Sequence, residues 1–438
     1  MQAQKLRGLG RGEMDMRRIT VIGGAGDMAR VAEEKLLSIC EGCRMVIADI
    51  DLDKAGRAAE RLGTTMAEAA RVDIYDPEGL REAIRGSDLV LNCTGPYYRT
   101  GRPVLEACID ERVDYIDLGD DDESATALLE LEGEAREAGI TALICCGIAP
   151  GMVNVMARAF ALEMDEVVNI DLAWVTGSTP PKEGKQKGGA AVIEHMVHCC
   201  MGRCTTVRDG KRVMIPSFRQ GHVLEFPEPL GSYQVFELGH AETATMPRFL
   251  PGVRNVRTMG ALNPPYLNGV FRGLARQVDK GAMDIKEAVD ILMALDAGEQ
   301  VKGIKPYLAI LGGVLSQLFR REITLADFRV FLREVAGRPS GESVGGLLVA
   351  VEGVKDGKQV RMQASESERQ GGPEGGMDMD EATGTPLAVF ASMLLDGLID
   401  DKGVFAPEGC IDPEEFLLRL ERAMPGYGDT MQLEETEV

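Results

Sequence analysis

Short apolar runs alternate with amphipathic segments along the first third of the chain. The runs are rich in Val, Ile and Leu, and the segments between them carry apolar residues at helical spacing. Strands separated by helices of this length predict a parallel sheet with right-handed crossovers, the doubly wound layout of α/β proteins. The expected strands lie in "RITVIGG", "RMVIADI", "RVDIYD", "LVLNCTG", "DYIDLG" and "ITALICCG".

The pattern changes after residue 150, where apolar and polar residues alternate with a period of two. This alternation is typical of half-buried antiparallel strands, which we expect in "VVNIDLAWVTG", "CTTVRDGKRVMIP", "GHVLEFP" and "YQVFELG". Asp-Gly pairs at 209–210 and 356–357 predict tight hairpin turns. Because helical segments intervene, the region predicts an α+β domain built on a mostly antiparallel sheet.

The last part of the chain combines a polar segment with two helical ones. The Gly- and Glu-rich stretch "ASESERQGGPEGGMDMDEATG" predicts a loop. Helices are expected beyond it in "TPLAVFASMLLDGLI" and "DPEEFLLRLERAM", the second opened by an Asp-Pro cap.

Composition narrows the classes of function. The 438 residues include 48 Lys and Arg against 70 Asp and Glu, which gives a net charge of −22. Such a surface repels phosphate backbones and anionic lipid, so we expect neither nucleic-acid nor membrane partners. The N-terminus lacks the apolar core of a signal peptide, and no apolar run has the length needed to span a bilayer. The ten cysteines are therefore expected as reduced, mostly buried thiols of a cytoplasmic protein.

The stretch "ITVIGGAGDMARVAEE" at 19–34 joins the first strand to the first helix through glycines. With 52 glycines in the chain, a G-x-G-x-x-[GA] match alone is expected about once by chance, so its context decides. A strand precedes this turn, a helix follows it, and Asp49 ends the next apolar run, where an acid binds the adenosine ribose. A dinucleotide site is therefore predicted, with a structural turn in a cofactor-free sheet as the alternative. The residues expected at the pyrophosphate are Gly24, Ala25, Gly26, Asp27 and Met28.

Individual positions of this turn have expected tasks. Gly24 allows the tight turn, Gly26 allows the pyrophosphate to approach, and Ala29 lets the helix pack closely on the strand. Asp49 would repel a 2′-phosphate, and it is followed by Ile50 rather than by an arginine. We therefore expect NAD as the cofactor in preference to NADP.

The stretch "NCTGPYYRTGRPVLEACIDERVDYIDLGDD" resembles the saccharopine dehydrogenase family. "CCGIAPGMVNVMA", "GHAETATMPRFLPGVRNV" and "GTPLAVFASMLLDGLIDDKGVFAPE" resemble it as well, so the likeness covers most of the chain. It implies a Rossmann domain at 18–150, completed by C-terminal helices at 381–438. It also implies an α+β domain at 151–380 that binds substrate and forms a homodimer. The residues that it places beside the nicotinamide ribose are Cys93, Thr94, Gly95 and Pro96.

The resemblance implies hydride transfer between a nicotinamide and a carbon that bears an amine. Oxidation requires a neutral amine, so a base is needed near the nicotinamide, and a carboxylate or a histidine can serve. Asp117, Asp120, Asp121 and Asp122 follow the fifth strand, at the edge where such sheets bind ligands. Asp117 and Asp120 are the catalytic candidates, with a solvated helix-capping loop as the alternative.

Further candidates lie on either side of the expected cleft. Tyr97 is a catalytic candidate and Tyr98 a substrate contact, and packing beneath the loop is the alternative for each. On a loop of the second domain, His240 is a catalytic candidate and Glu242 a substrate contact. Arg248 is expected to pair with a substrate carboxylate, with a surface ion pair as the alternative.

The cluster "EHMVHCCMGRC" allows more than one interpretation. His195 and His198 share a helix face and are followed by Cys199, Cys200 and Cys204, which are all zinc-ligand types. Adjacent cysteines point in different directions on a helix, so we expect no metal. His195 is instead expected to contact substrate, with a packed helix as the alternative.

The sequence thus predicts an NAD(P)-dependent oxidoreductase that acts on a small-molecule amine or amino acid. Its nearest functional types are lysine 6-dehydrogenase and saccharopine dehydrogenase. A second hypothesis is an NAD-dependent aminoalkyl transferase of the homospermidine synthase type. Such an enzyme reduces and reoxidises its cofactor within one turnover, so it would accumulate no net NADH. A non-catalytic NAD-binding regulatory protein is the third.

Overall fold

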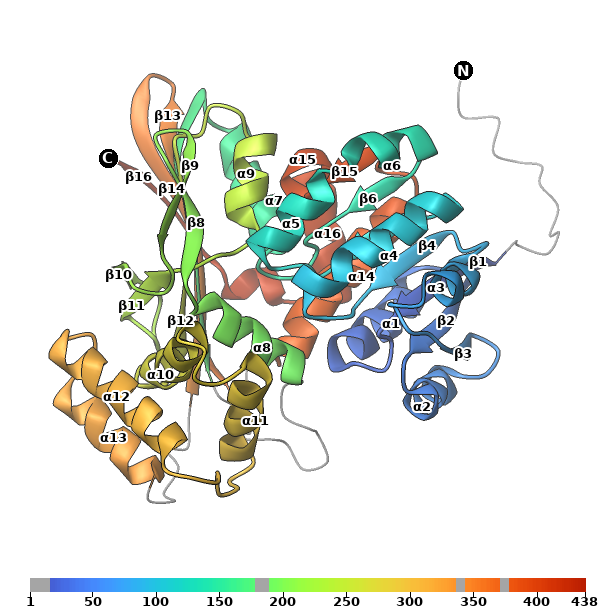
Figure 1. Cartoon of the computed structure of the whole chain (residues 1–438). Coiled ribbons are helices and arrows are strands. Elements are labelled where there is room, and N and C mark those ends of the chain that lie inside the picture. Colours follow the sequence, from blue (N-terminus) through green and yellow to red (C-terminus); the bar gives the residue numbers. More distant parts are fainter. Residues whose placement is uncertain (1–15, 178–188, 336–342, 371–377) are drawn as a thin grey trace.

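The computed structural model describes residues 16–177, 189–335, 343–370 and 378–438. Its strands form two sheets, one parallel and one mixed, which stand next to each other in Figure 1. The parallel sheet gathers the first six strands and one strand from near the C-terminus, and the mixed sheet gathers the others. The expected α/β class with a second sheet-based domain is confirmed.

The parallel sheet has seven strands in the order β3-β2-β1-β4-β5-β6-β15. The direction of strand addition reverses at β1, and such a reversal creates the crevice in which doubly wound sheets bind ligands. Alternate residues of β1 enter different cores, Ile19 and Val21 on one face and Ile22 on the other. The strands are β1 (Arg17–Ile22), β2 (Cys43–Asp49), β3 (Ala67–Arg71), β4 (Leu89–Asn92), β5 (Asp114–Asp117), β6 (Thr141–Leu143) and β15 (Gly403–Phe405).

Helices cover both faces of this sheet. One core contains α1 (Asp27–Ile39), α2 (Leu52–Leu62), α7 (Met152–Leu162), α14 (Met379–Leu395) and α16 (Pro413–Ala423). The other contains α3 (Pro77–Ile84), α4 (Tyr97–Glu111), α5 (Asp122–Leu129) and α6 (Glu132–Ala138). α14 approaches α1 so closely that a Cβ at Gly384 would lie 2.6 Å from the carbonyl oxygen of Met28. A C-terminal helix is thus packed directly on the helix that follows the dinucleotide turn.

The mixed sheet has nine strands, and its main path runs β10-β11-β12-β7-β13-β14-β16. β7 and β12 pair in parallel, whereas the other pairs of this sheet are antiparallel, so the expected mostly antiparallel sheet is confirmed. The strands are β7 (Glu166–Gly177), β8 (Arg203–Arg208), β9 (Lys211–Pro216), β10 (Gly221–Glu225), β11 (Ser232–Glu237), β12 (Asn255–Asn263), β13 (Ser343–Lys355), β14 (Lys358–Gln370) and β16 (Gln432–Glu437).

Six helices accompany this sheet among the described residues. They are α8 (Ala190–Cys199), α9 (Glu242–Phe249), α10 (Leu267–Asp279), α11 (Ile285–Asp296), α12 (Lys305–Phe319) and α13 (Leu325–Val335). α10 and α12 cross at contact distance, because a Cβ at Gly313 would lie 1.9 Å from the carbonyl oxygen of Gly269. α8 and α9 reach the parallel sheet and bring the two halves of the candidate site together (Figure 1).

Local turn chemistry agrees with the sequence at two hairpins and differs from it at the C-terminal end. Asp209–Gly210 and Asp356–Gly357 connect β8 to β9 and β13 to β14, and all four residues have positive φ, as tight hairpins require. The polar stretch expected to be a loop begins instead as strand, since β14 extends to Gln370; its residues 371–377 lie outside the described ranges. The helices expected after this stretch are present as α14 and α16, and β16 beyond them pairs with β14.

Within the described ranges, no helix has both the length and the apolar character needed to cross a bilayer.

Candidate active site

The dinucleotide turn joins β1 to α1. Gly23, rather than Gly24, has the left-handed backbone conformation, with a φ of 73°. Gly24 is required for space instead, because a Cβ there would lie 2.8 Å from the side chain of Ile47. A Cβ at Gly26 would lie 3.3 Å from the carbonyl oxygen of Gly23. No described side chain caps the helix that begins at Asp27, so its first N–H groups can bind a phosphate.

Asp49 ends β2 beside this turn. Its Oδ2 lies 3.4 Å from the backbone nitrogen of Ala25, and its Oδ1 accepts a 3.0 Å hydrogen bond from the backbone nitrogen of Asp51. The carboxylate therefore stands where a dinucleotide fold places the adenosine ribose. Ala25 and Met28 are partly exposed, which leaves the turn open to a ligand.

The segment after β4 forms the other wall of the crevice. Thr94 Oγ1 is buried and has no hydrogen-bond partner among the described residues. It also lies over the turn, because a Cβ at Gly23 would be 2.6 Å from it. A Cβ at Gly95 would lie 3.3 Å from Ala191 of α8, so the second domain contacts this loop. Cys93 is partly buried and precedes Thr94, and Pro96 caps α4.

These observations fit a nicotinamide dinucleotide. Protein neighbours leave no room for a Cβ at Gly24, so the turn stays short. The helix N-terminus offers free N–H donors for a pyrophosphate, and the Asp49 carboxylate offers acceptors for ribose hydroxyls. The orphaned Thr94 hydroxyl provides one more group for a ligand at the carboxyl end of β4.

Two of the expected catalytic groups have structural partners. Asp117 is fully buried, and its carboxylate accepts hydrogen bonds from the Tyr115 hydroxyl and from the backbone nitrogens of Gly119 and Cys145. Tyr97 is buried, and its hydroxyl donates to the carbonyl oxygen of Asn92 at 3.4 Å. Both side chains brace the strand ends, so the structure places neither in an open catalytic position.

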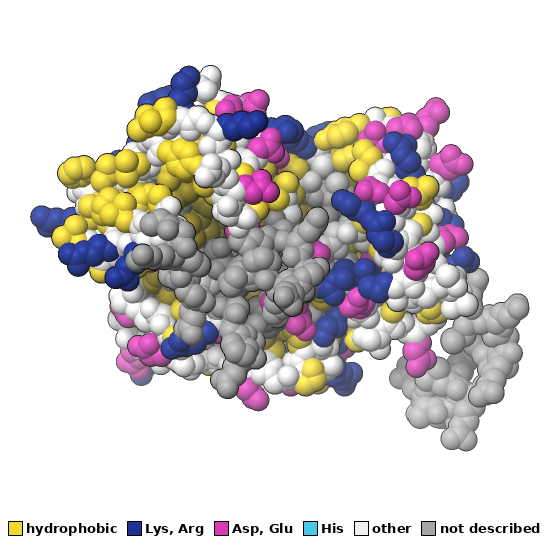
Figure 2. Space-filling view, turned by 90° about the horizontal axis from the view of Figure 1, so that it is seen from below, with side chains coloured by type: hydrophobic (Ala, Val, Ile, Leu, Met, Phe, Trp, Pro, Cys, Tyr) yellow, Lys and Arg dark blue, Asp and Glu magenta, His cyan; other side chains and the backbone are white. Residues whose placement is uncertain are grey.

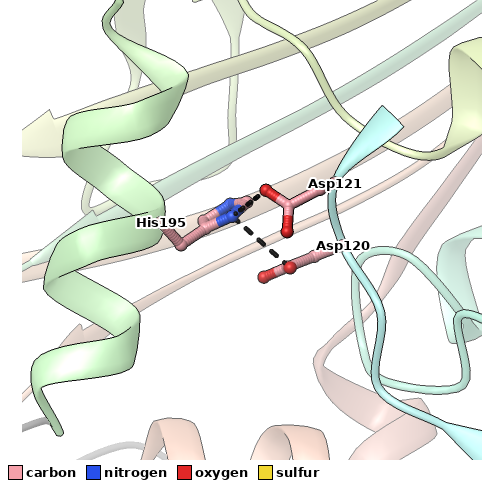
Figure 3. A group of neighbouring side chains, drawn as sticks. All are labelled: Asp120, Asp121 and His195. Atoms are coloured by element: carbon pink, nitrogen blue, oxygen red, sulfur yellow. Dashed lines mark hydrogen bonds and ion pairs between the residues drawn. The ribbon is translucent and has the colours of Figure 1, made fainter. Parts of the chain in front are cut away.

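Asp120, Asp121 and His195 form the polar centre of the site, as Figure 3 shows. His195 lies on α8 and points toward the two carboxylates of the loop that follows β5 (Figure 3). Its Nδ1 is 2.9 Å from Asp121 Oδ1 and 3.4 Å from Asp120 Oδ1. Its Nε2 is 3.3 Å from the Cys199 sulfur.

The three groups shift one another's protonation. Burial raises the pKa of Asp120 to about 6, although the charge of His195 opposes the shift. Burial also opposes ionisation of Asp121, but the hydrogen bond from His195 lowers the pKa of this carboxyl. Against the effect of burial, the two carboxylates raise the pKa of His195 well above its ordinary value. The arrangement therefore holds a charged histidine beside one ionised carboxylate and one carboxyl that titrates near neutrality.

A second histidine stands behind the first. His240 is buried in the loop between β11 and α9, and its Nδ1 is 2.6 Å from Glu242 Oε2. Its ring lies 5.7 Å from that of His195 in an edge-on arrangement. The loop is fixed to the acidic loop because Ala241 donates a backbone hydrogen bond to the carbonyl oxygen of Asp120 at 3.0 Å. Glu242 is fully buried, so it supports His240 rather than facing solvent.

Tyr98 closes the side of the site near α4. Its ring stacks on His198 at 4.5 Å, and its hydroxyl donates to Glu194 at 2.7 Å. Arg99 also pairs with Glu194, at 2.9 Å. Tyr98 is thus joined to α8 of the second domain, beside the Asp121–His195 pair.

Arg248 lies outside this arrangement. It pairs with Glu132 at the surface, so the alternative of a surface ion pair holds and the expected pairing with a substrate carboxylate is not supported. A pocket of about 380 Å³ beside Asp209 and Arg254 contains none of the candidate residues.

The sequence did not single out Asp121 as the partner of His195, nor Trp174 as a neighbour of His240. Asp121 and His195 are separated by 74 residues, so no local spacing relates them. Trp174 is the single tryptophan of the chain, and its ring lies 6.2 Å from that of His240. Being the single tryptophan is the one sequence signal that could have pointed to Trp174 as a site residue.

The zinc arrangement considered for the "EHMVHCCMGRC" segment is not assembled by the described residues. The groups of three donor side chains within 4.8 Å of one another are Asp120–Asp121–His195 and Asp121–Glu123–His198, and neither includes a cysteine. His195 Nδ1 is already bonded to Asp121 in the first group.

Two family models of known proteins match the chain, one over the parallel-sheet part and one over the rest. The family model described as the saccharopine dehydrogenase NADP binding domain matches residues 19–143, and that of the saccharopine dehydrogenase C-terminal domain matches residues 147–424. The chain belongs to the saccharopine dehydrogenase family. It is an NAD(P)-binding oxidoreductase of this family, as the sequence predicted.

Individual members of the family align over most of the chain. Carboxyaminopropylagmatine dehydrogenase of Synechocystis is 23% identical, over 93% of this chain and 96% of the relative. Carboxynorspermidine synthase of Vibrio alginolyticus is 26% identical, over 85% of this chain and 84% of the relative. The structure of an apo saccharopine dehydrogenase (L-Glu forming) from Saccharomyces cerevisiae superposes with a TM-score of 0.62 at 18% identity, over 96% of this chain and 100% of that one. This structural likeness shows the fold that the family shares.

Proposed function

We propose that the protein oxidises, or in reverse forms by reduction, the CH–NH bond of an amino acid or polyamine-like amine. The observation that carries the proposal is the Asp120–Asp121–His195 group, which lies between the acidic loop after β5 and α8. Two full-length relatives named for carboxyaminopropylagmatine and carboxynorspermidine support a substrate of this class. The oxidation of lysine at its side-chain amine and the cleavage of saccharopine are the most specific forms of the proposal.

The charges of the site suit a cationic amine. Asp120 and Asp121 attract an ammonium group to the carboxyl end of β5, and the backbone hydrogen bond from Ala241 to Asp120 fixes the acidic loop beside His240. The ammonium must lose a proton before its carbon can release hydride, and Asp120, whose carboxyl has a pKa of about 6, accepts that proton. Asp121 keeps His195 oriented and charged, and Glu242 orients the His240 ring from behind. A bound nicotinamide dinucleotide supplies the hydride acceptor.

NAD is the cofactor that we propose. The glycine turn and the α1 N-terminus would hold its pyrophosphate, and Asp49 its adenosine ribose. Ile50, which follows Asp49, is 61% exposed and offers no charge to a 2′-phosphate. Arg71 pairs in register with Asp49 at the end of β3 and is the group that would favour NADP. Michaelis constants for NAD and NADP in Asp49→Ala and Arg71→Ala distinguish these cofactors, since each variant should weaken only one of them.

The central experiment is a screen of amino acids, diamines, and amines combined with 2-oxo acids for formation or consumption of reduced cofactor. Activity with an amine-bearing substrate that is lost in Asp120→Asn supports the proposal. Asp110→Asn is the matched control, because Asp110 is an exposed aspartate paired with Arg81 at 3.2 Å. Product formation without net reduced cofactor would indicate the aminoalkyl transferase instead. Cofactor binding without turnover of any amine would indicate the regulatory protein.

We also propose a homodimer, with the exposed face of α12 as its contact with the second copy. Ile304, Leu308, Leu311 and Phe319 repeat at helical spacing and are all exposed, although the opposite face of α12 is buried on α10. Figure 2 shows a broad apolar area with dark-blue side chains beside it, on the side where Figure 1 places α12 and α13. Leu308→Lys should therefore shift the mass measured by light scattering toward that of one chain, and an unchanged mass would reject α12 as the contact.

The two domains have different proposed roles. Residues 18–150 with C-terminal helices from 381–438 bind the cofactor, and residues 151–380 bind substrate. Packing of α14 on α1 and pairing of β15 with β6 support the first assignment. The ten cysteines are all free thiols, which supports a cytoplasmic setting.

A further inference from the structure

Two thiols face each other at the opposite end of α1 from the dinucleotide turn. Cys40 caps the C-terminus of α1, and Cys43 begins β2 after the two-residue turn of Glu41 and Gly42. Gly42 has a φ of 73°, which allows the chain to reverse within this short segment. The two sulfur atoms are 2.8 Å apart, so a small movement would bring them to bonding distance.

Neighbouring groups shift the pKa values of the two thiols in opposite directions. Cys43 donates its S–H to Cys40, and the Arg17 guanidinium donates to the same Cys40 sulfur at 3.6 Å. The hydrogen bond from Cys43 and the charge of Arg17 lower the pKa of Cys40 to about 7, although burial opposes the shift. The hydrogen bond to Cys40 raises the pKa of Cys43, and burial adds to this effect. Cys40 is thus the nucleophile of the pair, and Cys43 is positioned to resolve it.

The pair differs from the other cysteines of the chain. Burial raises the pKa of every other thiol: Cys93, Cys108, Cys145, Cys146, Cys199, Cys200, Cys204 and Cys410. Cys145 and Cys146 are adjacent in sequence, yet each is fully buried. Cys40 alone therefore combines a stabilised thiolate with a partner thiol in contact.

Access to Cys40 selects a small oxidant. Its side chain is 7% exposed, whereas that of Cys43 is 0% exposed. Arg17, which contacts the Cys40 sulfur, also lines a pocket of about 200 Å³ with residues of β4, β5 and α14. Because so little of Cys40 is exposed, a hydroperoxide is small enough to reach its sulfur, while a bulky disulfide is not.

We propose that Cys40 and Cys43 form a redox-active dithiol that hydrogen peroxide converts to an intramolecular disulfide. The Cys40 thiolate attacks one peroxide oxygen, the O–O bond breaks, and the released hydroxide takes up a proton to become water. The resulting Cys40 sulfenic acid is attacked by the Cys43 sulfur, which forms the S–S bond and releases a second water molecule. The two thiols together lose two electrons and two protons, and one hydrogen peroxide becomes two waters. An external dithiol reverses the change by thiol–disulfide exchange.

The site leaves the cofactor turn untouched. α1 has 13 residues, so the pair lies about 20 Å along the helix from Gly26, at about 1.5 Å per residue. Oxidation should therefore tie the end of α1 to the start of β2 without changing cofactor affinity. The inference does not depend on the proposed substrate.

The test uses the full-length protein, hydrogen peroxide as the probe and peptide mass spectrometry as the readout. Trypsin releases residues 36–44 as one peptide, "LLSICEGCR", which holds both cysteines of the pair and no other. Peroxide followed by alkylation should give this peptide unalkylated and two hydrogen atoms lighter, and a dithiol should restore double alkylation. The rate should increase as the pH rises through about 7, as the Cys40 thiolate forms.

Variants separate the two roles. Cys43→Ser should trap Cys40 as a sulfenic acid that a dimedone reagent labels, whereas Cys40→Ser should leave Cys43 unmodified. Arg17→Met should slow oxidation severalfold, and Cys410→Ser is the control that should leave the rate unchanged. Retention of two alkylated cysteines in the wild-type peptide while another cysteine is oxidised would overturn the proposal. Equal labelling of Cys43 and Cys40 in the two single variants would do the same.

Discussion

Replacing Glu33 by glutamine is expected to stabilise the protein, and increasingly so as the pH rises. Glu33 lies on α1 with a side chain that is 0% exposed, and its Oε2 accepts a hydrogen bond from Arg61 at 3.0 Å. Its Oε1 is buried without a hydrogen-bond partner among the described residues. Burial raises the pKa of this carboxyl to about 8, although Arg61 opposes the shift.

The sign follows from proton binding in the two states. An acid whose pKa is raised on folding keeps its proton in the folded protein at pH values where the unfolded chain has released it. Its contribution to stability is therefore fullest below 4.5, the ordinary pKa, and declines as the pH rises toward about 8. A shift from 4.5 to about 8 corresponds to at most about 5 kcal/mol, at about 1.36 kcal/mol per pKa unit. Roughly half of this loss in the free energy of unfolding occurs between about pH 5 and about pH 7.

Urea unfolding of wild type and Glu33→Gln at a series of pH values measures the effect. Glutamine retains the shape and the acceptor for Arg61 but never ionises, so the difference in free energy of unfolding should grow by roughly 2–3 kcal/mol over that interval. Glu34→Gln is the matched control, because Glu34 is the next residue of α1 and its side chain is 43% exposed. Parallel curves for wild type and Glu33→Gln would show that Glu33 is ionised in the folded protein and would contradict the raised pKa.

Three further predictions concern the site. Asp49→Ala should raise the Michaelis constant for NAD in steady-state kinetics by roughly 10- to 100-fold, which corresponds to the loss of a hydrogen bond to a charged group. An unchanged Michaelis constant would show that Asp49 does not bind the cofactor. Amine oxidation should fall as the pH drops through about 6, where Asp120 becomes protonated. Asp120→Asn should lose roughly 10²- to 10⁴-fold in kcat/KM together with this acidic limb, whereas Asp110→Asn should keep both. Gly24→Ala should destabilise the folded protein by roughly 1–3 kcal/mol, because the new Cβ would lie 2.8 Å from the side chain of Ile47 on β2. Gly56→Ala is the contrasting variant: the new Cβ on α2 would meet no neighbour, so the protein should become more stable by about 0.5–1 kcal/mol. Thermal unfolding measures both changes.

The dinucleotide turn shows how far local sequence reasoning extends. The strand before the turn, the helix that begins at Asp27 and the acid at the end of β2 all follow from short-range patterns, and the structure has each of them. The expectation that Gly24 allows the tight turn did not specify a conformation; the positive φ lies at Gly23, and Gly24 lacks room for a Cβ. Consecutive glycines satisfy the same pattern, and only the positions of β2 and β4 determine which one must lack a Cβ and which one must have positive φ.

The polar segment before α14 shows where composition misleads. Its residues 364–370 are rich in Ser and Glu and were expected in a loop, yet they form the end of β14. This part of β14 pairs with β13, and Ala364 and Ser365 are buried there. Strand formation in this segment depends on hydrogen bonds to a neighbouring strand, which no property of the segment itself reveals.

Residues close along the chain were enough to predict the class of the fold, the family, the glycine turn between β1 and α1, and the two Asp-Gly hairpins. These features depend on residues that are close along the chain or on motifs that members of the family share. Only the tertiary structure joined His195 to Asp121 across 74 residues, placed Asp117 and Tyr97 in structural roles, and set the Cys40 and Cys43 sulfurs 2.8 Å apart. A pKa, an ion pair or a reactive thiol depends on burial and on neighbouring groups, and packing between segments that are distant in sequence sets both.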